Sequence, residues 1–565
     1  RKKELEEIAA ACEWAPENPA RSFREALQVQ WFIQLFTQIE QNIGGGQMSG
    51  RMDQYLGRFY ENDLAAGKIT REEAIELLQC VWLNMFQMTQ IKMTPSGAAA
   101  NEGYAHFELV SLGGLDADGH DATNELTYVI LESTRPLQIT YPDVGIRIHA
   151  NSPARLLHAA VEAIKDGKGM PKLFNDEFII PFYVALGCTP AEANDWTPTS
   201  CADNRVLARE THVTGNGGLN WAAPVELTLR NGKIKILHNL PFGVETGDPR
   251  TFATFDDFWH AFRRQLEHLL KHTMIQQMTA NAIAGQYLAA PLATLTSPVL
   301  MEACIDIHDH YHAMEVPGAL DISMLESVGF ATAIDSIAAV KHLIYDTKQI
   351  TWDELLDALD KNWEGAEAIR QLCANAPKYG NGIEWVDALG FELERIILEY
   401  ARQYPKPHGQ PWCYKCVPVT FHVPMGKMIS ATPNGRRAGE FLSEGVSASH
   451  GMDVKGPTTA LVSIARAHCT SLRGNGPKLI NLKMNPTNVA GEDGTRRLVQ
   501  LIQAWRDLKL WHVQFNIINK QTLLAAQKDP SKYRDLVVRI AGYSAYFVDL
   551  SPMQQAEIIA RTEEQ

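Results

Sequence analysis

The segment Leu536-Val537-Val538-Arg539-Ile540-Ala541-Gly542-Tyr543-Ser544-Ala545-Tyr546-Phe547-Val548 lies near the carboxyl end of the chain. β-Branched and aromatic residues dominate it, which predicts extended structure. Gly542 interrupts the run. An isolated glycine there marks a bulge or a close approach of the backbone to another group, and the pattern alone favours the bulge.

Gly542 also has a chemical property that no other residue type shares, because its Cα carries no side chain. Loss of one hydrogen from this carbon leaves a planar radical, stabilised between the electron-donating amide nitrogen and the electron-withdrawing carbonyl group. Such a radical can exchange hydrogen with a cysteine thiol, since the two bonds are of similar strength. A functional interpretation of Gly542 therefore stands beside the structural one.

The composition is that of a globular protein: 565 residues, 45% of them apolar and 21% charged. These values exclude disordered, collagen-like and coiled-coil classes. The 52 Lys and Arg against 66 Asp and Glu, a net charge of −14, argue against a nucleic-acid partner. No run reaches the roughly eighteen apolar residues that a bilayer requires, so we expect no membrane association. Nine cysteines without framework spacing indicate a reducing, cytoplasmic location.

Strand-like and helical patterns alternate along the chain, which predicts an α/β fold. Capping signals at Ser22 and Thr70 predict helix starts in the first hundred residues. Further expected elements are a strand pair or bent strand at 137–149, an extended segment at 223–229, helices at 255–283 and 494–507, and a strand at 511–518. Turn residues crowd 430–439 and predict a boundary there.

Three segments resemble the glycyl radical enzymes of the pyruvate formate-lyase-like superfamily: 538–544, 431–440 and 446–451. Three more landmarks are similar and follow in order, namely Gly50-Arg51-Met52-Asp53-Gln54-Tyr55, Phe174-Asn175-Asp176-Glu177 and His422-Val423-Pro424-Met425-Gly426-Lys427. The resemblance covers nearly the whole chain. It implies a ten-stranded barrel of two five-stranded half-sheets surrounded by helices, with the glycyl radical loop inserted into the barrel. The barrel domain would span 1–429, incomplete at its amino end since the chain opens at Arg1, and the glycine radical domain 430–565.

Cys201 lies in the turn-rich segment Thr199-Ser200-Cys201-Ala202-Asp203. A single loop cysteine is most often a small semi-polar residue. By resemblance, however, this loop carries the cysteine that takes the radical from Gly542, so Cys201 would become the thiyl that abstracts hydrogen from substrate. The thiol donates the hydrogen atom, and no lowered pKa is required. Ser200 and Ala202 flank Cys201, so the cysteine pair of pyruvate formate-lyase itself is absent, which argues against formate C-acetyltransferase activity.

Asp203 could face the same way as Cys201 if the loop is extended, because side chains alternate along a strand. An aspartate in a loop is more often a turn former. In the eliminating members of the resembled family, a glutamate at this spacing acts as a base toward a substrate hydroxyl. Asp203 is one methylene shorter, which leaves the reaction class open.

Several further polar residues are candidates for binding substrate, although each could equally be a structural partner. Two arginines and a histidine near the thiol would suit a carboxylate or sulfonate, since guanidinium pairs bidentately with planar anions. The candidates are Arg205, Arg209, His212, Asn216 and, from a distant loop, Asp53.

We predict no metal site. Cys413 and Cys416 have CxxC spacing but lack a second ligand pair, and we interpret them as two unconnected thiols. His308, His310 and His312 lie two residues apart and are interpreted as packing or solvated side chains.

The resemblance implies a glycyl radical lyase that cleaves a C–O, C–N or C–S bond of a small polar substrate. The alternatives are decarboxylation of an arylacetate, addition to fumarate, and an inactive or incomplete chain without enzymatic function. No bound cofactor is expected. A separate iron–sulfur, S-adenosylmethionine-dependent activating enzyme would install the radical on Gly542, and a homodimer is possible.

Overall fold

The computed structural model describes residues 1–562 apart from short gaps. The residues left out are 42–48, 89–94, 104–107, 207–208, 210–216, 290, 295–297, 307–308, 314, 321–323, 407–408, 469–472 and 563–565. No helix in the described part of the chain is long and apolar enough to cross a bilayer.

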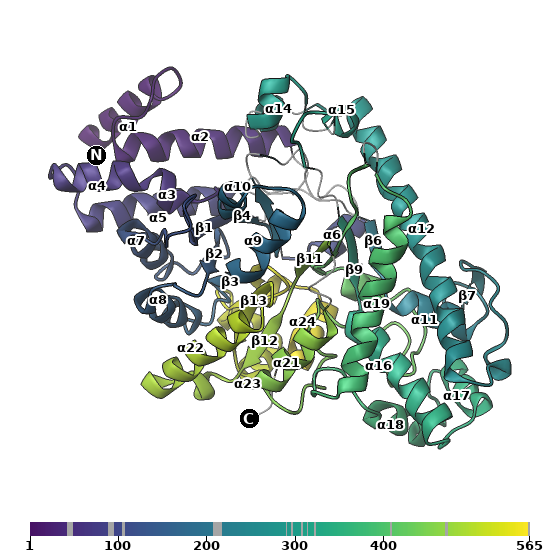
Figure 1. Cartoon of the computed structure of the whole chain (residues 1–565). Helices are drawn as coiled ribbons and strands as arrows, with labels where there is room; N and C mark the ends of the chain where they lie inside the picture. The colour runs from purple at the N-terminus through teal and green to yellow at the C-terminus, as the bar shows by residue number, and fades with distance from the viewer. Residues whose placement is uncertain are drawn as a thin grey trace.

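A strongly curved set of strands occupies the centre of the molecule (Figure 1). One half consists of parallel strands: β6 (Gly217–Asn220), β9 (Met324–Val328), β10 (Cys413–Cys416), β11 (Asn475–Lys478) with its continuation β12 (Asn481–Met484), and β13 (His512–Ile517). The other half also runs parallel within itself: β3 (Lys172–Asn175), β2 (Asp143–Ile148) and β1 (Leu109–Gly113). The two halves join where β13 pairs antiparallel with β3.

The bend between β11 and β12 makes the two sheets continuous. The Leu479 N–H donates to the Cys416 carbonyl (3.1 Å), and the Ile480 carbonyl accepts from the Gln514 N–H (3.0 Å). The mixed α/β architecture predicted from the alternating pattern is confirmed. Ten strands were expected, five in each half-sheet. The described residues form five strands in one half-sheet, with β11 and β12 counted as one, and three in the other.

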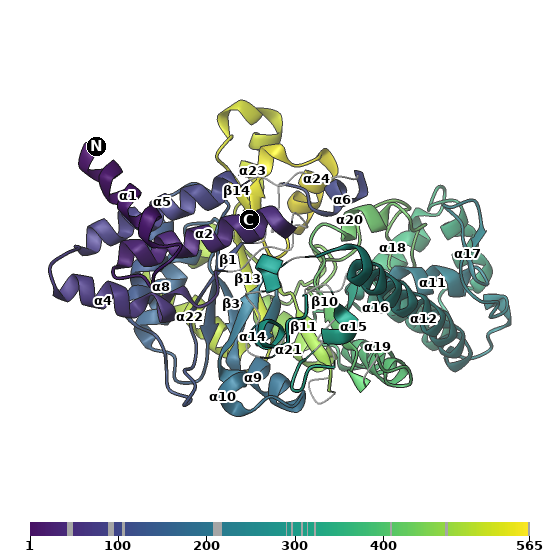
Figure 2. The same cartoon turned by 90° about the horizontal axis from the view of Figure 1, so that it is seen from above.

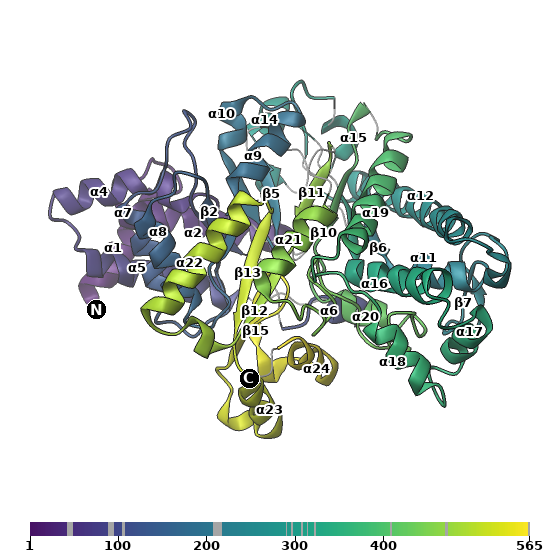
Figure 3. The same ribbon diagram turned by 60° about the horizontal axis from the view of Figure 1, so that its bottom comes forward.

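Two groups of helices flank the strands, and all three views keep them on opposite sides (Figures 1, 2 and 3). Beside β1 and β2 lie α1 (Lys2–Trp14), α2 (Phe23–Gln41), α3 (Met52–Tyr55), α4 (Gly57–Ala65), α5 (Arg71–Gln87), α7 (Glu125–Thr134), α8 (Ala154–Ile164) and α22 (Gly491–Asp507). Beside β6 and β9 lie α11 (Ala222–Leu229), α12 (Phe255–Tyr287), α16 (Phe330–Val340), α17 (Trp352–Asp360), α18 (Glu367–Asn375) and α19 (Glu384–Arg402).

Shorter helices close the ends of the strand layer or follow the strands. These are α6 (Pro95–Ala100), α9 (Asp176–Ala185), α10 (Pro190–Asn194), α13 (Pro291–Thr294), α14 (Pro298–Ala303), α15 (His310–Ala313), α20 (His422–Gly426), α21 (Pro457–Ala467), α23 (Lys520–Lys528) and α24 (Pro552–Arg561). Figure 3 shows α23 and α24 together at one end of β12 and β13.

Local signals account for several helix starts. Thr70 begins α5 with a capping box to Glu73, as its sequence predicts, and Thr254 does the same for α12. The prediction of an extended segment at 223–229 is wrong, because these residues belong to helix α11. Every residue of α11 is buried, so the sequence carries no alternation between polar and apolar faces that could reveal its period. The strand pair or bent strand expected at 137–149 is a single strand, β2, which begins only at Asp143.

A buried ion pair secures the strand end nearest α9. Arg147 of β2 forms two hydrogen bonds of 3.0 Å with Asp176, and its remaining donors bind the carbonyls of Asn194 and Trp196. Both charged side chains are almost fully enclosed. The guanidinium therefore connects the barrel wall to the segment that precedes Cys201.

We expect Arg147→Met to lower the free energy of unfolding by about 3–5 kcal/mol, because it leaves the Asp176 carboxylate buried without its partner. The matched control is Arg496→Met, which removes the exposed pair with Asp493 and should cost less than about 1 kcal/mol. Guanidinium unfolding curves measure both changes. Equal shifts in the two variants would show that the Arg147 pair does not stabilise the fold.

Candidate active site

Two hairpin tips from distant parts of the sequence meet inside the strand layer. Cys201 lies in the turn between β4 (Trp196–Thr199) and β5 (Asp203–Val206), and Gly542 lies in the turn between β14 (Val537–Arg539) and β15 (Ser544–Tyr546). A methyl group placed on Gly542 would lie 2.1 Å from the Cys201 Cβ and 2.7 Å from its Sγ. The two residues are therefore in direct contact, and glycine is required for that approach.

The backbone of Gly542 adds a second requirement for glycine. Its φ of +87° lies in the left-handed region, which other residues adopt only with strain. The interruption in the strand pattern thus marks a close approach to another group, the less favoured of the two structural interpretations.

Both peptide groups of Gly542 are bound by side chains of the barrel wall. Its N–H donates to the Gln514 Oε1 (2.9 Å), and its carbonyl accepts from the Lys172 Nζ (3.0 Å). Gln514 Oε1 also accepts from the Arg539 Nε (2.7 Å). On the opposite tip, the Ala202 carbonyl accepts from the Trp511 indole (3.0 Å). Each tip is therefore held by residues that lie in or beside β3 and β13.

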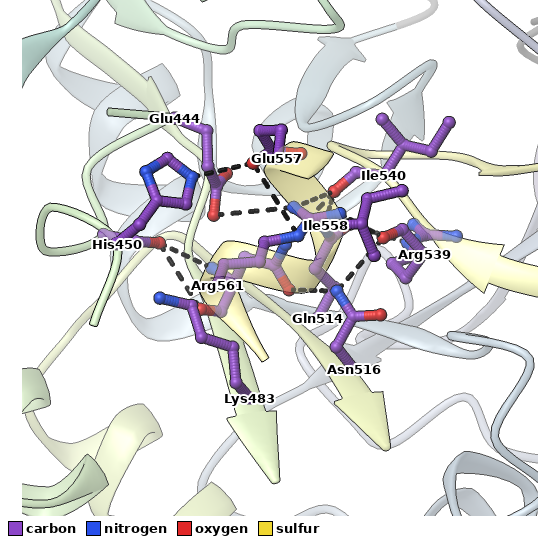
Figure 4. A network of polar contacts seen from close by, with 12 residues as sticks. Glu444, His450, Lys483, Gln514, Asn516, Arg539, Ile540, Glu557, Ile558 and Arg561 are labelled. Carbon is purple, nitrogen blue, oxygen red and sulfur yellow. Dashed lines mark hydrogen bonds and ion pairs between the residues drawn. The ribbon is translucent and has the colours of Figure 1, made fainter. Parts of the chain in front are cut away.

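The strand that leads to Gly542 is anchored from the last helix (Figure 4). Arg561 of α24 donates to the carbonyls of Arg539 (2.5 Å) and Ile540 (2.8 Å), and Asn516 donates to the Arg539 carbonyl (3.0 Å). Glu557, one turn before Arg561, accepts from His450 (2.7 Å). These contacts fix how deeply the glycine hairpin enters the barrel.

A cluster of charged groups lies beside the thiol. The Lys415 Nζ lies 3.1 Å from the Asp203 Oδ1 and 3.6 Å from the Glu326 Oε2, and all three side chains are buried. Glu326 and Lys415 are register partners on β9 and β10, so they project from the same face of the wall. Asp203 reaches the pair from the hairpin, three residues after Ser200, whose hydroxyl donates to it (3.2 Å).

This cluster holds two carboxyl groups against one ammonium. Burial raises the pKa of Glu326 to about 7, and the Asp203 charge adds to the rise while Lys415 opposes it. Burial works against the charge of Lys415, but the two carboxylates outweigh it and raise the pKa of the ammonium. Burial also raises the pKa of Cys201 to about 12, so its sulfur carries a hydrogen at neutral pH, as hydrogen-atom transfer requires.

Of the other predicted site residues, Asp53, Arg205 and Arg209 lie in the described part of the chain. Asp53 is buried on α3, where its carboxylate accepts from the Gly113 N–H (2.8 Å) and the Thr127 hydroxyl (2.7 Å). Arg209 pairs with Glu192 (3.0 Å) and donates to the Gly318 carbonyl. Arg205 is half-buried on β5, opposite Thr197. His212 and Asn216 lie outside the described residues, and the substrate-binding roles of all five remain predictions.

Sequence reasoning missed Glu326, Lys415, Lys172 and Gln514. A signal was available, because a charged residue inside an apolar strand is costly to bury unless it is paired. Lys415 lies between Cys413 and Cys416; both cysteines are buried, and no disulfide joins them. His310 and His312 belong to the short helix α15, where the exposed His312 contacts Asp309, while His308 is outside the described residues.

The fold and the two tips define an α/β barrel that holds one glycine against one cysteine. Comparison with known proteins identifies the class. The family model for Pyruvate formate lyase-like proteins matches residues 1–426, and that for the Glycine radical domain matches residues 442–548. The chain belongs to the glycyl radical enzymes, and its relatives place it with the lyases and dehydratases, not with the formate acetyltransferases.

Isethionate sulfite-lyase from Nitratidesulfovibrio vulgaris is 46% identical over 562 residues, which are 100% of this chain and 67% of that protein. Trans-4-hydroxy-L-proline dehydratase from Clostridioides difficile is 32% identical, over 100% of this chain and 70% of the relative. Among solved structures, the B12-independent glycerol dehydratase from Clostridium butyricum superposes with a TM-score of 0.92 at 34% identity, covering 100% of this chain and 70% of that one. The α/β barrel expected from the sequence is confirmed by this match.

The raised pKa of Glu326 has a testable sign. Between pH 4.5 and about 7, Glu326 keeps its proton in the folded protein but has lost it in the unfolded chain. A rise in pH through this window therefore favours the unfolded chain, and the free energy of unfolding falls. We expect Glu326→Gln to gain thermal stability relative to the unmodified protein on going from about pH 5 to about pH 8. Thermal melts at both pH values measure the difference.

The control is Glu392→Gln, which removes a partly exposed partner of Arg395 and should keep the pH dependence of the unmodified protein. Melting curves of Glu326→Gln that stay parallel to those of the unmodified protein across this range would show that Glu326 is ionised throughout.

Proposed function

We propose that this enzyme eliminates sulfite or water from a small hydroxylated substrate, with Gly542 storing the radical, Cys201 carrying it to the substrate and Asp203 acting as the base. The contact between Gly542 and Cys201 carries the proposal. Relatives named as C–S lyases and dehydratases support elimination over decarboxylation or addition to fumarate.

The first step is a hydrogen transfer between the two tips. The Cys201 S–H bond breaks, a C–H bond forms at Gly542, and the unpaired electron remains on sulfur. Such a transfer requires van der Waals reach and a site closed to water, because solvent and oxygen quench carbon and sulfur radicals. Cys201 is 2% exposed, which fits this requirement.

The elimination then uses the charged cluster. The Cys201 thiyl takes hydrogen from the carbon that bears the substrate hydroxyl, and Asp203 accepts the hydroxyl proton. The resulting ketyl expels the group on the neighbouring carbon together with its bonding pair. Glu326, neutral below about pH 7, can protonate an oxygen leaving group. The product radical finally takes a hydrogen from the Cys201 thiol, which regenerates the thiyl.

Lys415 has two uses in this scheme. Its ammonium binds Asp203 in the resting site and can stabilise negative charge that develops on the substrate oxygen or on a departing sulfite. Because sulfite-lyases are among the most similar relatives reported above, we rank a hydroxyalkanesulfonate first among substrates. Asp203 is one methylene shorter than the glutamate expected at this spacing, so the position of its carboxylate does not by itself identify the substrate.

Radical installation is part of the same proposal. A separate S-adenosylmethionine-dependent activating enzyme would abstract hydrogen from Gly542. Gly542 is buried in the present structure, so the β14–β15 hairpin must withdraw from the barrel to meet that partner.

The decisive experiment activates the protein without oxygen, using a radical S-adenosylmethionine activating enzyme and reductant. Electron paramagnetic resonance should then show a doublet from the single hydrogen left on Gly542, and isethionate should yield sulfite. Trans-4-hydroxy-L-proline and glycerol form parallel arms that test dehydration. Gly542→Ala should lose the doublet, whereas Cys201→Ser should keep it and release no product.

Gly67→Ala is the matched control, because Gly67 also has a positive φ but no atom lies within 4 Å of a Cβ added there, and this variant should keep both signal and turnover. Product release by Cys201→Ser, or no doublet in the unmodified protein, would refute the proposed relay.

Asp203→Asn tests the base. An amide cannot accept the hydroxyl proton, so we expect product formation to fall by about a hundredfold or more while the radical doublet persists. Asp203→Glu should recover part of the rate, because it restores the carboxylate. Undiminished turnover in Asp203→Asn would remove this residue from the mechanism.

A further inference from the structure

One ammonium group contacts both hairpin tips. Lys172 of β3 donates to the carbonyl of Gly542 (3.0 Å) and, by a shorter hydrogen bond, to the carbonyl of Ser200. Ser200 directly precedes Cys201 in the chain. Lys172 thus binds a peptide group next to the thiol and a peptide group of the glycine that the thiol contacts.

The position of Lys172 is itself fixed by a buried network. Its Nζ lies 2.8 Å from the Asp143 Oδ2 of β2, and the Lys172 side chain is fully enclosed. Asp143 also accepts two hydrogen bonds from Arg539 of β14 (3.1 and 3.0 Å). The wall strands β2 and β3 therefore hold the ammonium in place, and Arg539 brings the glycine hairpin to the same anchor.

Other polar groups at the site reach one tip only in the contacts described above. Gln514 binds the Gly542 N–H, and Arg561 binds carbonyls further down the same hairpin. Trp511 binds the cysteine hairpin. Lys172 differs from these because its two acceptors belong to hairpins that lie more than three hundred residues apart in sequence.

We infer that Lys172 is a positioning residue for the radical relay: it holds the Cys201 sulfur against the Gly542 Cα by binding the Ser200 and Gly542 carbonyls at once. This inference rests on the proposed function, since it presumes that hydrogen passes between these two atoms. In that step the S–H bond of Cys201 breaks, the C–H bond of Gly542 forms, and the unpaired electron moves to sulfur. A small increase in separation slows such a transfer strongly.

The test measures hydrogen transfer between Cys201 and Gly542 in the absence of substrate. In deuterated buffer, the activated enzyme carries deuterium on the Cys201 sulfur, and each return transfer can replace the remaining hydrogen of the Gly542 radical. The doublet then collapses to a single line at a rate set by the relay. We expect Lys172→Met to form the doublet and to slow both its collapse and product release by about tenfold or more.

Lys172→Met leaves Asp143 paired with Arg539, which favours folding of the variant. If Lys172→Met accumulates no radical, Lys172→Gln is the deciding variant, because its shorter and uncharged side chain should hold the two carbonyls less firmly and should also slow the collapse. The matched control is Lys168→Met. Lys168 is likewise buried, and its ammonium donates to the carbonyls of Thr134, Arg135 and Leu137. Its backbone carbonyl accepts from the Ser544 hydroxyl of the glycine hairpin, and the substitution retains that carbonyl, so loss of the ammonium should leave the collapse rate unchanged.

The outcomes separate the two proposals. No doublet, or no collapse in the unmodified protein, refutes the relay between Gly542 and Cys201 itself. Collapse at the unmodified rate in a Lys172 variant refutes the role of Lys172 alone. Slowed collapse in Lys172 variants with normal collapse in Lys168→Met supports the positioning role.

Discussion

Direct contact between one backbone carbon and one sulfur is the constraint on which the rest of this structure depends. Gly542 has no room for even a methyl group, because Cys201 occupies that space. The hydrogen transfer proposed for this pair slows steeply with separation, so the two atoms must be in contact. Radicals react with water and oxygen, so that contact must also be enclosed. A barrel that admits two hairpin tips from opposite parts of the chain meets both demands.

Enclosure brings charged groups into a region of low polarity, where an unpaired charge is costly. The structure resolves this by pairing. Asp143 is shared by Lys172 and Arg539, and Lys415 is shared by Asp203 and Glu326. The two groups serve different purposes. The first holds backbone atoms in place, whereas the second has one carboxyl whose proton is available near neutral pH.

The glycine hairpin is attached to the wall chiefly by side chains. β14 and β15 pair with each other as a separate two-stranded sheet, while Gln514, Asn516 and Arg561 bind the backbone of residues 539–542. Withdrawal of the hairpin would break these contacts without breaking any strand pairing within the half-sheets. That arrangement fits the withdrawal of the hairpin proposed above for installation of the radical.

The sequence by itself determined the alternating α/β pattern, the family and the pair Gly542 and Cys201, because a glycine within a strand-like run and an ordered set of landmarks are visible in one dimension. It did not reveal α11, whose uniform burial removes any period. It also missed Lys172, Glu326 and Lys415. Each is the single charged residue of its strand, and its role depends on which strand lies beside it and which hairpin reaches it. Strand register and hairpin insertion are set by long-range packing, so only the tertiary structure decided which charges share the site.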